Sequence, residues 1–179
     1  MKRIGDQALP FRLPALGDDG FAFINPDALL GRWVVLSFVQ GLNAGDSALW
    51  DDEGRCVRAF GATLLVVPSE AKTVHRPQIH ASSHHFTIVA DPLGRLQRLY
   101  GGRTLLSSGT ARTFLVDPGG RLRFHVVHSV SPRGMDMISE VLFSHRSEQM
   151  GGWRGDSKIG EQTRECLSPV ACGYESVPD

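Results

Sequence analysis

Two apolar segments, joined by a stretch with helical features, constrain the fold of this chain more than any other part of the sequence. Residues 33–39 and 63–67 are nearly continuous runs of apolar, largely β-branched side chains, which is typical of strands buried on both faces of a sheet. Between them, Asp46 or Ser47 can cap a helix that continues to Phe60. A strand, a helix and a second strand in this order imply a right-handed crossover between two parallel strands. We therefore predict an α/β fold with helices on both sides of a central mixed sheet.

Shorter segments complete the expected sheet and its helices. Asp117, Pro118, Gly119 and Gly120 separate two apolar segments, a pattern that is typical of a hairpin turn. Pro77 suits the first turn of a helix in the polar segment around it. The predicted elements are two strands within 10–25, strands at 86–89, 113–116 and 122–127, and helices at 75–85, 93–100 and 132–143.

The last part of the chain differs in composition from the rest. From Ser144 onward the sequence is polar, contains several glycines and shows no sustained periodicity, which predicts an extended or partly disordered tail. We accordingly expect one domain over residues 1–143 and a polar C-terminal tail over residues 144–179. A chain of 179 residues is long enough for one domain with a sizeable core.

Charge and cysteine usage exclude several classes of function. Lys and Arg number 19 and Asp and Glu number 19, so the formal net charge is zero, and neither nucleic-acid binding nor attraction to an anionic membrane is expected. No apolar run is long enough for a membrane helix, and the N-terminus lacks the apolar core of a secretory signal. Three cysteines are too few for a disulfide-built scaffold, so we predict a cytoplasmic protein. No cofactor is predicted.

Several short motifs occur in an order that is similar to that of a known family. They are IGDQALPFRLP at residues 4–14, GRWVVLSF at 31–38, ADPLG at 90–94, LYG at 99–101 and RTFLVDPGG at 112–120. In this order they resemble the peroxiredoxins, the alkyl hydroperoxide reductase and thiol-specific antioxidant branch of the thioredoxin fold. The resemblance covers about residues 4–143. It implies a thioredoxin-like fold, descent from an antioxidant oxidoreductase and, as is common in that family, a homodimer.

The sequence departs from the family at its catalytic positions. Peroxiredoxins follow the first core strand with a proline, a threonine or serine four positions later, and the peroxidatic cysteine three positions after that. Counted from the end of the 31–38 motif, these places hold Gln40, Ala44 and Ser47. Arg112 matches the family's catalytic arginine. Because all three places differ, divergence of the natural sequence explains them better than a single engineered replacement at Ser47.

The chemistry of peroxide reduction shows why the change at Ser47 matters. A thiolate attacks the O–O bond and becomes a sulfenic acid, and a helix N-terminus and a guanidinium lower the pKa of that cysteine. The Ser47 hydroxyl cannot form a sulfenic acid and does not ionise near neutral pH, so we interpret Ser47 as a helix cap. For Arg112, two interpretations stay open. It is either a salt-bridged arginine at a sheet edge or an anion- or oxygen-binding group in a pocket shared with Ser47.

The three cysteines are candidate redox thiols. Cys56 lies within the predicted helix at the spacing of its apolar residues, so we interpret it as a buried core thiol. Cys166 and Cys172 lie in the predicted tail, where some peroxiredoxins carry a resolving cysteine. Because no peroxidatic partner is recognisable, we interpret both as unpaired thiols in a reducing cytosol. A disulfide between them, or an arrangement over a partner subunit's site, is the alternative.

The histidines include one pair at a metal-binding spacing. His80 and His84 are four positions apart, which places both on one face of a helix. The sequence has no HExxH motif and no paired cysteines, so we predict a solvated polar helix rather than a metal site. We expect His125 and His128 to be positional rather than ligating.

Three functions stay open from the sequence. The first is peroxide reduction through an atypical thiol, Cys56 or a tail cysteine. The second is a repurposed enzyme, for example in a biosynthetic pathway, whose pocket at residues 40–47 and Arg112 handles a different small molecule. The third is a non-enzymatic binding or regulatory protein. In each case the usual peroxidatic mechanism is absent, and the expected ligand is a peroxide or another small molecule.

Overall fold

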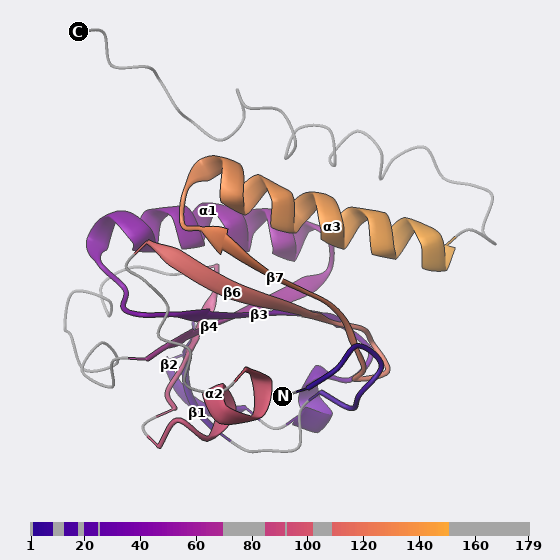
Figure 1. Ribbon diagram of the computed structural model, residues 1–179, viewed down its shortest axis with the longest axis horizontal. Coiled ribbons are helices and arrows are strands. Elements are labelled where there is room, and N and C mark those ends of the chain that lie inside the picture. The colour runs from indigo at the N-terminus through magenta and orange to yellow at the C-terminus, as the bar shows by residue number, and fades with distance from the viewer. Residues whose placement is uncertain are drawn as a thin grey trace, which may run out of the picture.

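The computed structural model describes residues 2–8, 13–17, 20–24, 26–69, 85–91, 93–101 and 109–150. These residues form one seven-stranded mixed sheet, in the order β2-β1-β5-β4-β3-β6-β7, with helices on both faces (Figure 1), which confirms the predicted α/β fold. The strands are β1 (Leu13–Gly17), β2 (Gly20–Ile24), β3 (Trp33–Val39), β4 (Ala62–Pro68), β5 (Thr87–Val89), β6 (Thr110–Val116) and β7 (Leu122–Ser129). The helices are η1 (Pro26–Leu29), α1 (Ala44–Ala59), α2 (Arg95–Tyr100) and α3 (Pro132–Met150).

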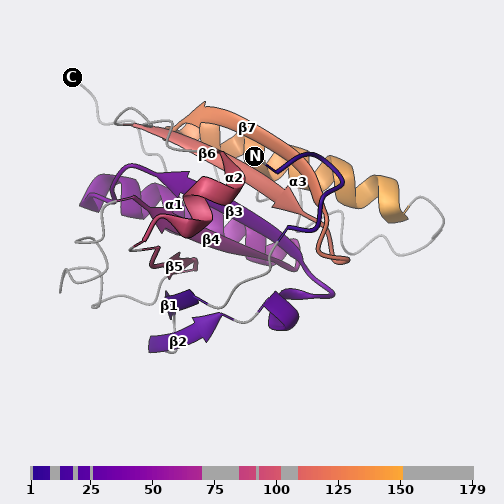
Figure 2. The same ribbon diagram turned by 60° about the horizontal axis from the view of Figure 1, so that its bottom comes forward.

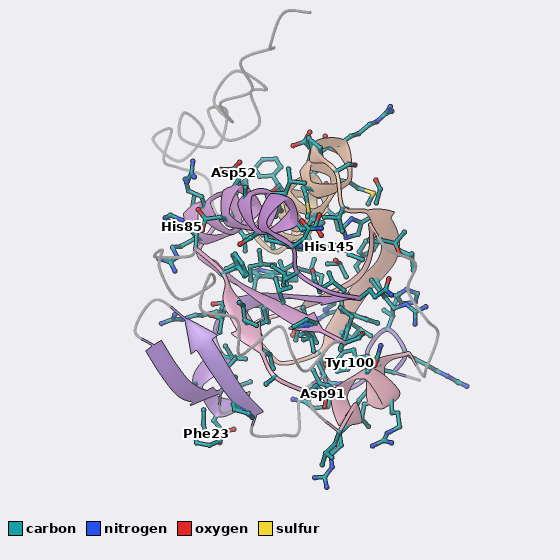
Figure 3. All side chains as sticks on the ribbon, turned by 90° about the vertical axis from the view of Figure 1, so that its left-hand side faces the viewer. Phe23, Asp52, His85, Asp91, Tyr100 and His145 are labelled. Carbon is teal, nitrogen blue, oxygen red and sulfur yellow. The ribbon has the colours of Figure 1, made fainter. Side chains whose placement is uncertain are left out.

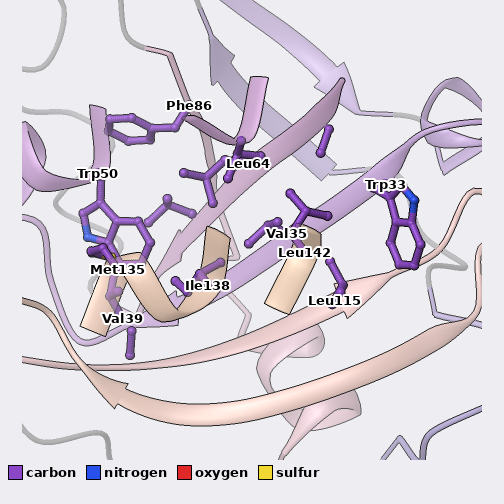
Figure 4. Close-up of a cluster of buried hydrophobic side chains, with 14 of the residues drawn as sticks. Trp33, Val35, Val39, Trp50, Leu64, Phe86, Leu115, Met135, Ile138 and Leu142 are labelled. Carbon is purple, nitrogen blue, oxygen red and sulfur yellow. The ribbon is translucent and has the colours of Figure 1, made fainter. Parts of the chain in front are cut away.

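The sheet has a hydrophobic core on each of its faces. α1 and α3 lie side by side on one face, and α2 lies on the opposite face (Figure 1, Figure 2). Figure 4 shows the cluster beneath α1 and α3, in which Trp50, Val57 and Leu142 are fully buried. Leu96 and Tyr100 of α2 pack into the second cluster. The central strands therefore need apolar side chains on both faces of the sheet.

β3 is the central strand on which the rest of the sheet is built. All seven of its residues are buried. Val35 and Val39 point into the core beneath α1 and α3, whereas Leu36 and Phe38 point into the core on the α2 side, as strand alternation requires. β3 pairs in parallel with β4, with Val35 opposite Leu64, and antiparallel with β6. The parallel pair confirms the predicted crossover through α1.

The start of α1 differs from the prediction. Asn43 has an extended backbone, with φ −95° and ψ 172°, and its Oδ1 atom accepts a hydrogen bond from the Asp46 N–H at 2.8 Å. This is the geometry of an N-cap, so the prediction that Asp46 or Ser47 caps the helix is wrong. Leu42 is buried directly before Asn43 and fixes the chain against the core there. The helix therefore begins at Ala44, and Ser47 lies in its first turn.

The hairpin between β6 and β7 is confirmed. The Gly120 N–H donates to the Asp117 carbonyl at 2.8 Å, and the Asp117 N–H donates to the Arg121 carbonyl at 2.9 Å. Gly120 has a φ of 78°, a left-handed conformation that glycine adopts without steric cost. The turn residues therefore have the structural role that the sequence predicts.

α3 is longer than predicted. The sequence indicated a helix that ends at residue 143, and in the structure the helix continues to Met150. The His145 ring lies 6.3 Å from the Trp33 ring and 6.2 Å from the Phe124 ring. Through these contacts, the face of α3 that packs on the sheet continues beyond residue 143, although the sequence there has no regular apolar pattern. Residues 144–150 are therefore helical rather than extended.

Some predicted segments lie outside the described residues. They are the predicted helix at 75–85, apart from its last residue, and the part of the tail from residue 151 onward. The boundary between a domain at 1–143 and a tail at 144–179 stays a prediction. In the part of the chain that the structure describes, no helix is long and apolar enough to cross a membrane.

Candidate functional site at the carboxyl end of β3

The chain leaving β3 carries three of the four predicted catalytic positions. β3 ends at Val39, Gln40 follows as an exposed residue, and Ala44 is the first residue of α1. Ser47 is half-buried in the first turn of α1, where its backbone N–H donates to the Asn43 carbonyl at 2.9 Å. The structure thus places Gln40, Ala44 and Ser47 along the loop and helix start that follow β3.

Arg112 reaches the same end of the sheet from the neighbouring strand. On β6 it lies opposite Phe38, one residue before β3 ends. Opposite residues of an antiparallel pair share a face of the sheet, so the Arg112 side chain lies on the α2 side with Phe38 and Phe114. Its Nη1 atom donates a hydrogen bond to the Gly101 carbonyl at 3.2 Å, just after α2. β6 lies between β3 and β7, so Arg112 is not on an edge strand.

Ser47 and Arg112 therefore lie at one end of the sheet but form hydrogen bonds with different groups. The Ser47 backbone bonds to Asn43, and the Arg112 guanidinium bonds to Gly101. A guanidinium carries five N–H donors, so the bond to Gly101 leaves donors that a ligand can use. Both side chains are half-buried. A cavity that Ser47 and Arg112 share stays a prediction.

Among the candidate redox thiols, Cys56 is the one that the structure describes. It lies on α1 with 8% of its surface exposed, which agrees with its interpretation as a buried core thiol. Cys166 and Cys172 lie outside the described residues, as do His80 and His84. Among the residues that are described, no group of three or more His, Cys, Asp and Glu side chains could hold a metal ion.

A chain of buried polar groups crosses three strands, and sequence reasoning missed it. Ser37 Oγ lies 2.7 Å from Thr113 Oγ1, which lies 2.8 Å from His128 Nε2. His128 Nδ1 lies 2.9 Å from the Ser129 carbonyl, which can only accept, so we assign the imidazole proton to Nδ1. Thr113 then donates to His128 Nε2, and Ser37 donates to Thr113. The sequence signal for this chain is only Ser37, a polar residue within an apolar strand, and it does not identify the partners.

The surroundings of His128 favour its neutral form. Burial lowers the pKa of His128 from its ordinary value, and the hydrogen bond to the Ser129 carbonyl opposes this shift. The neutral imidazole is also the form that can accept a hydrogen bond from Thr113. His128 is thus held in place by its neighbours, in line with the positional role expected from the sequence.

A second buried polar group, the Glu53 carboxyl, lies between α1 and α3. Glu53 has 4% of its surface exposed, and Ser139 Oγ donates to its Oε1 atom at 2.8 Å. Burial raises the pKa of Glu53 from 4.5 to about 8; the hydrogen bond from Ser139 lowers it, and the charge of Asp136 raises it. Glu53 lies three residues after Trp50 and four before Val57, on the buried side of α1, and this spacing was visible in the sequence.

Comparison with protein families agrees with the fold and with the order of the motifs. The chain matches the model of the AhpC/TSA family over residues 4–125. This match spans more than half of the chain, and the chain belongs to the AhpC/TSA family. Among curated proteins, none matches this chain significantly.

Solved peroxiredoxin structures share this architecture. AhpC of Enterococcus faecalis is 18% identical with a TM-score of 0.67, over 87% of this chain and 99% of that chain. The mitochondrial 2-Cys peroxiredoxin of Plasmodium falciparum is 14% identical with a TM-score of 0.64, over 86% and 100%. AhpC of Mycobacterium bovis is 23% identical with a TM-score of 0.64, over 83% and 94%. These likenesses confirm the thioredoxin-like, peroxiredoxin-type fold.

Proposed function

We propose that this AhpC/TSA family member does not reduce peroxides at the family's cysteine position, and that it binds a small molecule there instead. One observation carries the proposal. Ser47 lies in the first turn of α1, at the place where the family resemblance puts the peroxidatic cysteine. A hydroxyl oxygen cannot be oxidised to a sulfenic acid, so position 47 does not support the family's reaction.

The surroundings of Arg112 support a binding role. Phe38 and Phe114 lie on the same face of the sheet as Arg112, and their rings meet edge-on with centroids 5.7 Å apart. A guanidinium that is partly shielded from water attracts an anion or a polarised oxygen more strongly than an exposed one. The exposed amide of Gln40 adds a donor and an acceptor at the same end of β3. These groups suit a small molecule with a carboxylate, phosphate or peroxide oxygen.

Peroxide reduction through another thiol is the second candidate function. Cys56 favours it, because this thiol lies on the same helix as Ser47. Its burial opposes it, because the attacking thiolate of a peroxidase has to meet the peroxide. Cys166 and Cys172 are the remaining thiols for this candidate. A homodimer, a non-enzymatic regulatory role and a cytoplasmic location are further proposals, which rest on the family resemblance and on the composition.

The test of the proposed site introduces the missing sulfur. In Ser47→Cys, with Cys166 and Cys172 replaced by serine, we expect hydrogen peroxide to produce a sulfenic acid at position 47. A dimedone adduct on the peptide that contains this position measures the reaction. The helix start and Arg112 should lower the pKa of the introduced thiol by at least about one unit, which gives about tenfold more thiolate near neutral pH.

Ser144→Cys in the same background is the matched control, because Ser144 is an exposed serine on α3. We expect its thiol to react about tenfold more slowly than the thiol at position 47. Equal rates at the two positions would contradict the proposal that residues 40–47 and Arg112 form a site.

A further inference from the structure

We propose that Gly101 is a positioning residue for Arg112. Its carbonyl oxygen and its lack of a side chain together determine where the guanidinium lies at the carboxyl end of β3. This inference deepens the function proposed above and rests on it, because it names the residue through which the fold places the ligand-binding cation. Four observations carry it: a hydrogen bond, a close approach, a φ outside the left-handed region and a helix that is held at both ends.

The Arg112 guanidinium lies directly against the main chain of Gly101. Its Nη1 atom donates to the Gly101 carbonyl at 3.2 Å. A Cβ atom built at position 101 would overlap with this Nη1 atom, and would lie 3.2 Å from Arg112 Cζ and 3.5 Å from Arg112 Cδ. The guanidinium therefore occupies the space that any other residue at position 101 would fill.

The φ angle of Gly101 is not one of the positive values that favour glycine. Gly101 has a φ of −169° and a ψ of 8°, so its φ lies outside the left-handed region. This distinguishes Gly101 from Gly94 at the other end of α2, which has a φ of 59° in the left-handed region. At position 101, Arg112 occupies the space that a side chain would need.

Hydrogen bonds hold α2 at both of its ends. The Gly101 carbonyl that follows α2 is therefore held in one position, where it accepts the hydrogen bond from Arg112. At its start, Asp91 accepts hydrogen bonds from the backbone N–H groups of Arg95 and Gln97 at 2.8 and 3.0 Å. At its end, the buried Tyr100 donates its hydroxyl hydrogen to the Ala8 carbonyl. Figure 3 shows Asp91 and Tyr100 at α2.

Tyr100 also links the end of α2 to the surroundings of Arg112. Its ring lies 5.7 Å from the Phe38 ring and 4.8 Å from the Phe114 ring. Phe38 is opposite Arg112 in the sheet, and Phe114 is two residues further along β6. The residue before Gly101 and the two neighbours of Arg112 thus form one aromatic cluster, which sets the distance between α2 and β6.

These contacts predict that a change at position 101 affects the position of Arg112 more than it affects the fold. In Gly101→Ala the atoms that must give way are the far end of a flexible side chain, so the melting temperature should change by no more than about 2 °C. In the matched control Gly94→Ala, the new side chain meets only Gln97 Oε1 at an ordinary contact distance of 3.9 Å, but the backbone is left-handed. We expect this control to lower the melting temperature by about 2–4 °C without moving Arg112.

The position of Arg112 can be followed by the resonance of its Nη1–H group, the donor to the Gly101 carbonyl, in the isotope-labelled full-length chain at low temperature, assigned by its loss in Arg112→Lys. We expect Gly101→Ala to shift this resonance and to speed the exchange of its proton with water, because the hydrogen bond to Gly101 is lost. Gly94→Ala should leave both unchanged. An unshifted resonance with unchanged exchange in Gly101→Ala would overturn the inference.

A second measurement separates this inference from the proposed function. In the Ser47→Cys background, the pH dependence of alkylation at position 47 gives the pKa of the introduced thiol. We expect Arg112→Ala and Gly101→Ala to raise that pKa in the same direction, since both remove the guanidinium from its place. If Arg112→Ala leaves the pKa unchanged, the shared site proposed for Ser47 and Arg112 is wrong. The role of Gly101 is then still decided by the Arg112 resonance.

Discussion

Among single residues, Thr113 has the most demanding position, because it joins Ser37 on β3 to His128 on β7. It accepts a hydrogen bond from Ser37 and donates one to His128, and all three side chains are buried. A buried polar group that loses its partner costs about 1–3 kcal/mol, whereas a satisfied one is nearly neutral or slightly stabilising. The removal of Thr113 would therefore leave two partners without their bonds.

We expect Thr113→Val, which keeps the shape of the side chain, to lower the free energy of unfolding by about 1–3 kcal/mol, measured by urea denaturation. Thr63→Val on the neighbouring strand β4 is the control, because Thr63 is only half-buried and takes part in none of the side-chain hydrogen bonds of the described residues. It should change the free energy of unfolding by less than about 0.5 kcal/mol. Equal losses in both variants would show that the chain of polar groups does not stabilise the sheet.

Sequence reasoning found the residues of the candidate site more readily than the buried polar residues. Gln40, Ala44 and Ser47 are close together in the chain, and a motif with fixed spacing identifies them. Ser37 and Thr113 are 76 positions apart, and their contact depends on the register between β3 and β6. No local pattern contains that register, so the hydrogen bond could not be predicted from the sequence.

Among the elements, α1 allows a direct test of which residue caps its N-terminus, with two substitutions. Asn43 caps the helix in the structure, whereas the sequence pointed to Asp46 or Ser47. We expect Asn43→Ala to lower the free energy of unfolding by about 1 kcal/mol, because the Asp46 N–H loses its acceptor. Ser47→Ala should change it by less than about 0.5 kcal/mol. A larger loss in Ser47→Ala than in Asn43→Ala, measured by urea denaturation, would restore the original prediction.

The contact between α1 and α3 should make the stability of the protein depend on pH through Glu53. The pKa of Glu53 is 4.5 when it is exposed and about 8 in the folded protein, because burial raises it. Between these two values the folded protein keeps a proton that the unfolded chain has released. The free energy of unfolding therefore falls as pH rises from about 4.5 to 8, by up to about 1.4 kcal/mol for each unit of pKa shift.

Glu53→Gln removes the ionisation and keeps an oxygen that can accept the hydrogen bond from Ser139. We expect this variant to lose much less stability than the wild type between pH 5 and 8, as measured by urea denaturation at a series of pH values. Glu140→Gln is the control, since Glu140 is exposed on the same helix as Ser139. Its free energy of unfolding should fall with pH as that of the wild type does. A wild-type curve without this fall would contradict the assignment of a protonated Glu53.

The elements themselves were predicted best where a local pattern determines them. The segment from β3 through α1 to β4 alternates buried strand, helix and buried strand, and this order alone implies the parallel pair that the structure contains. The last part of α3 has no such pattern. It is helical because His145 contacts Trp33 and Phe124, and those contacts depend on the packing of α3 against the sheet.

For the whole molecule, the order of the strands determines which of the candidate residues lie at the same end of the sheet. β6 lies beside β3, so Arg112 reaches the end of β3, from which the chain continues into the loop before Ser47. Hydrophobic periodicity predicts strands but does not say that β6 is the neighbour of β3. That neighbourhood comes from the structure, and solved structures such as AhpC of Enterococcus faecalis share the fold.

Hydrogen peroxide consumption, with dithiothreitol as the reductant, tests most directly the claim that this family member has lost the usual thiol peroxidase reaction. The rate is compared between the wild-type chain and a variant in which Cys56, Cys166 and Cys172 are all replaced by serine, after circular dichroism has shown that both are folded. We predict that the two rates are equal and no higher than the rate without protein. A wild-type rate well above that background, lost when the three cysteines are replaced, would contradict the claim.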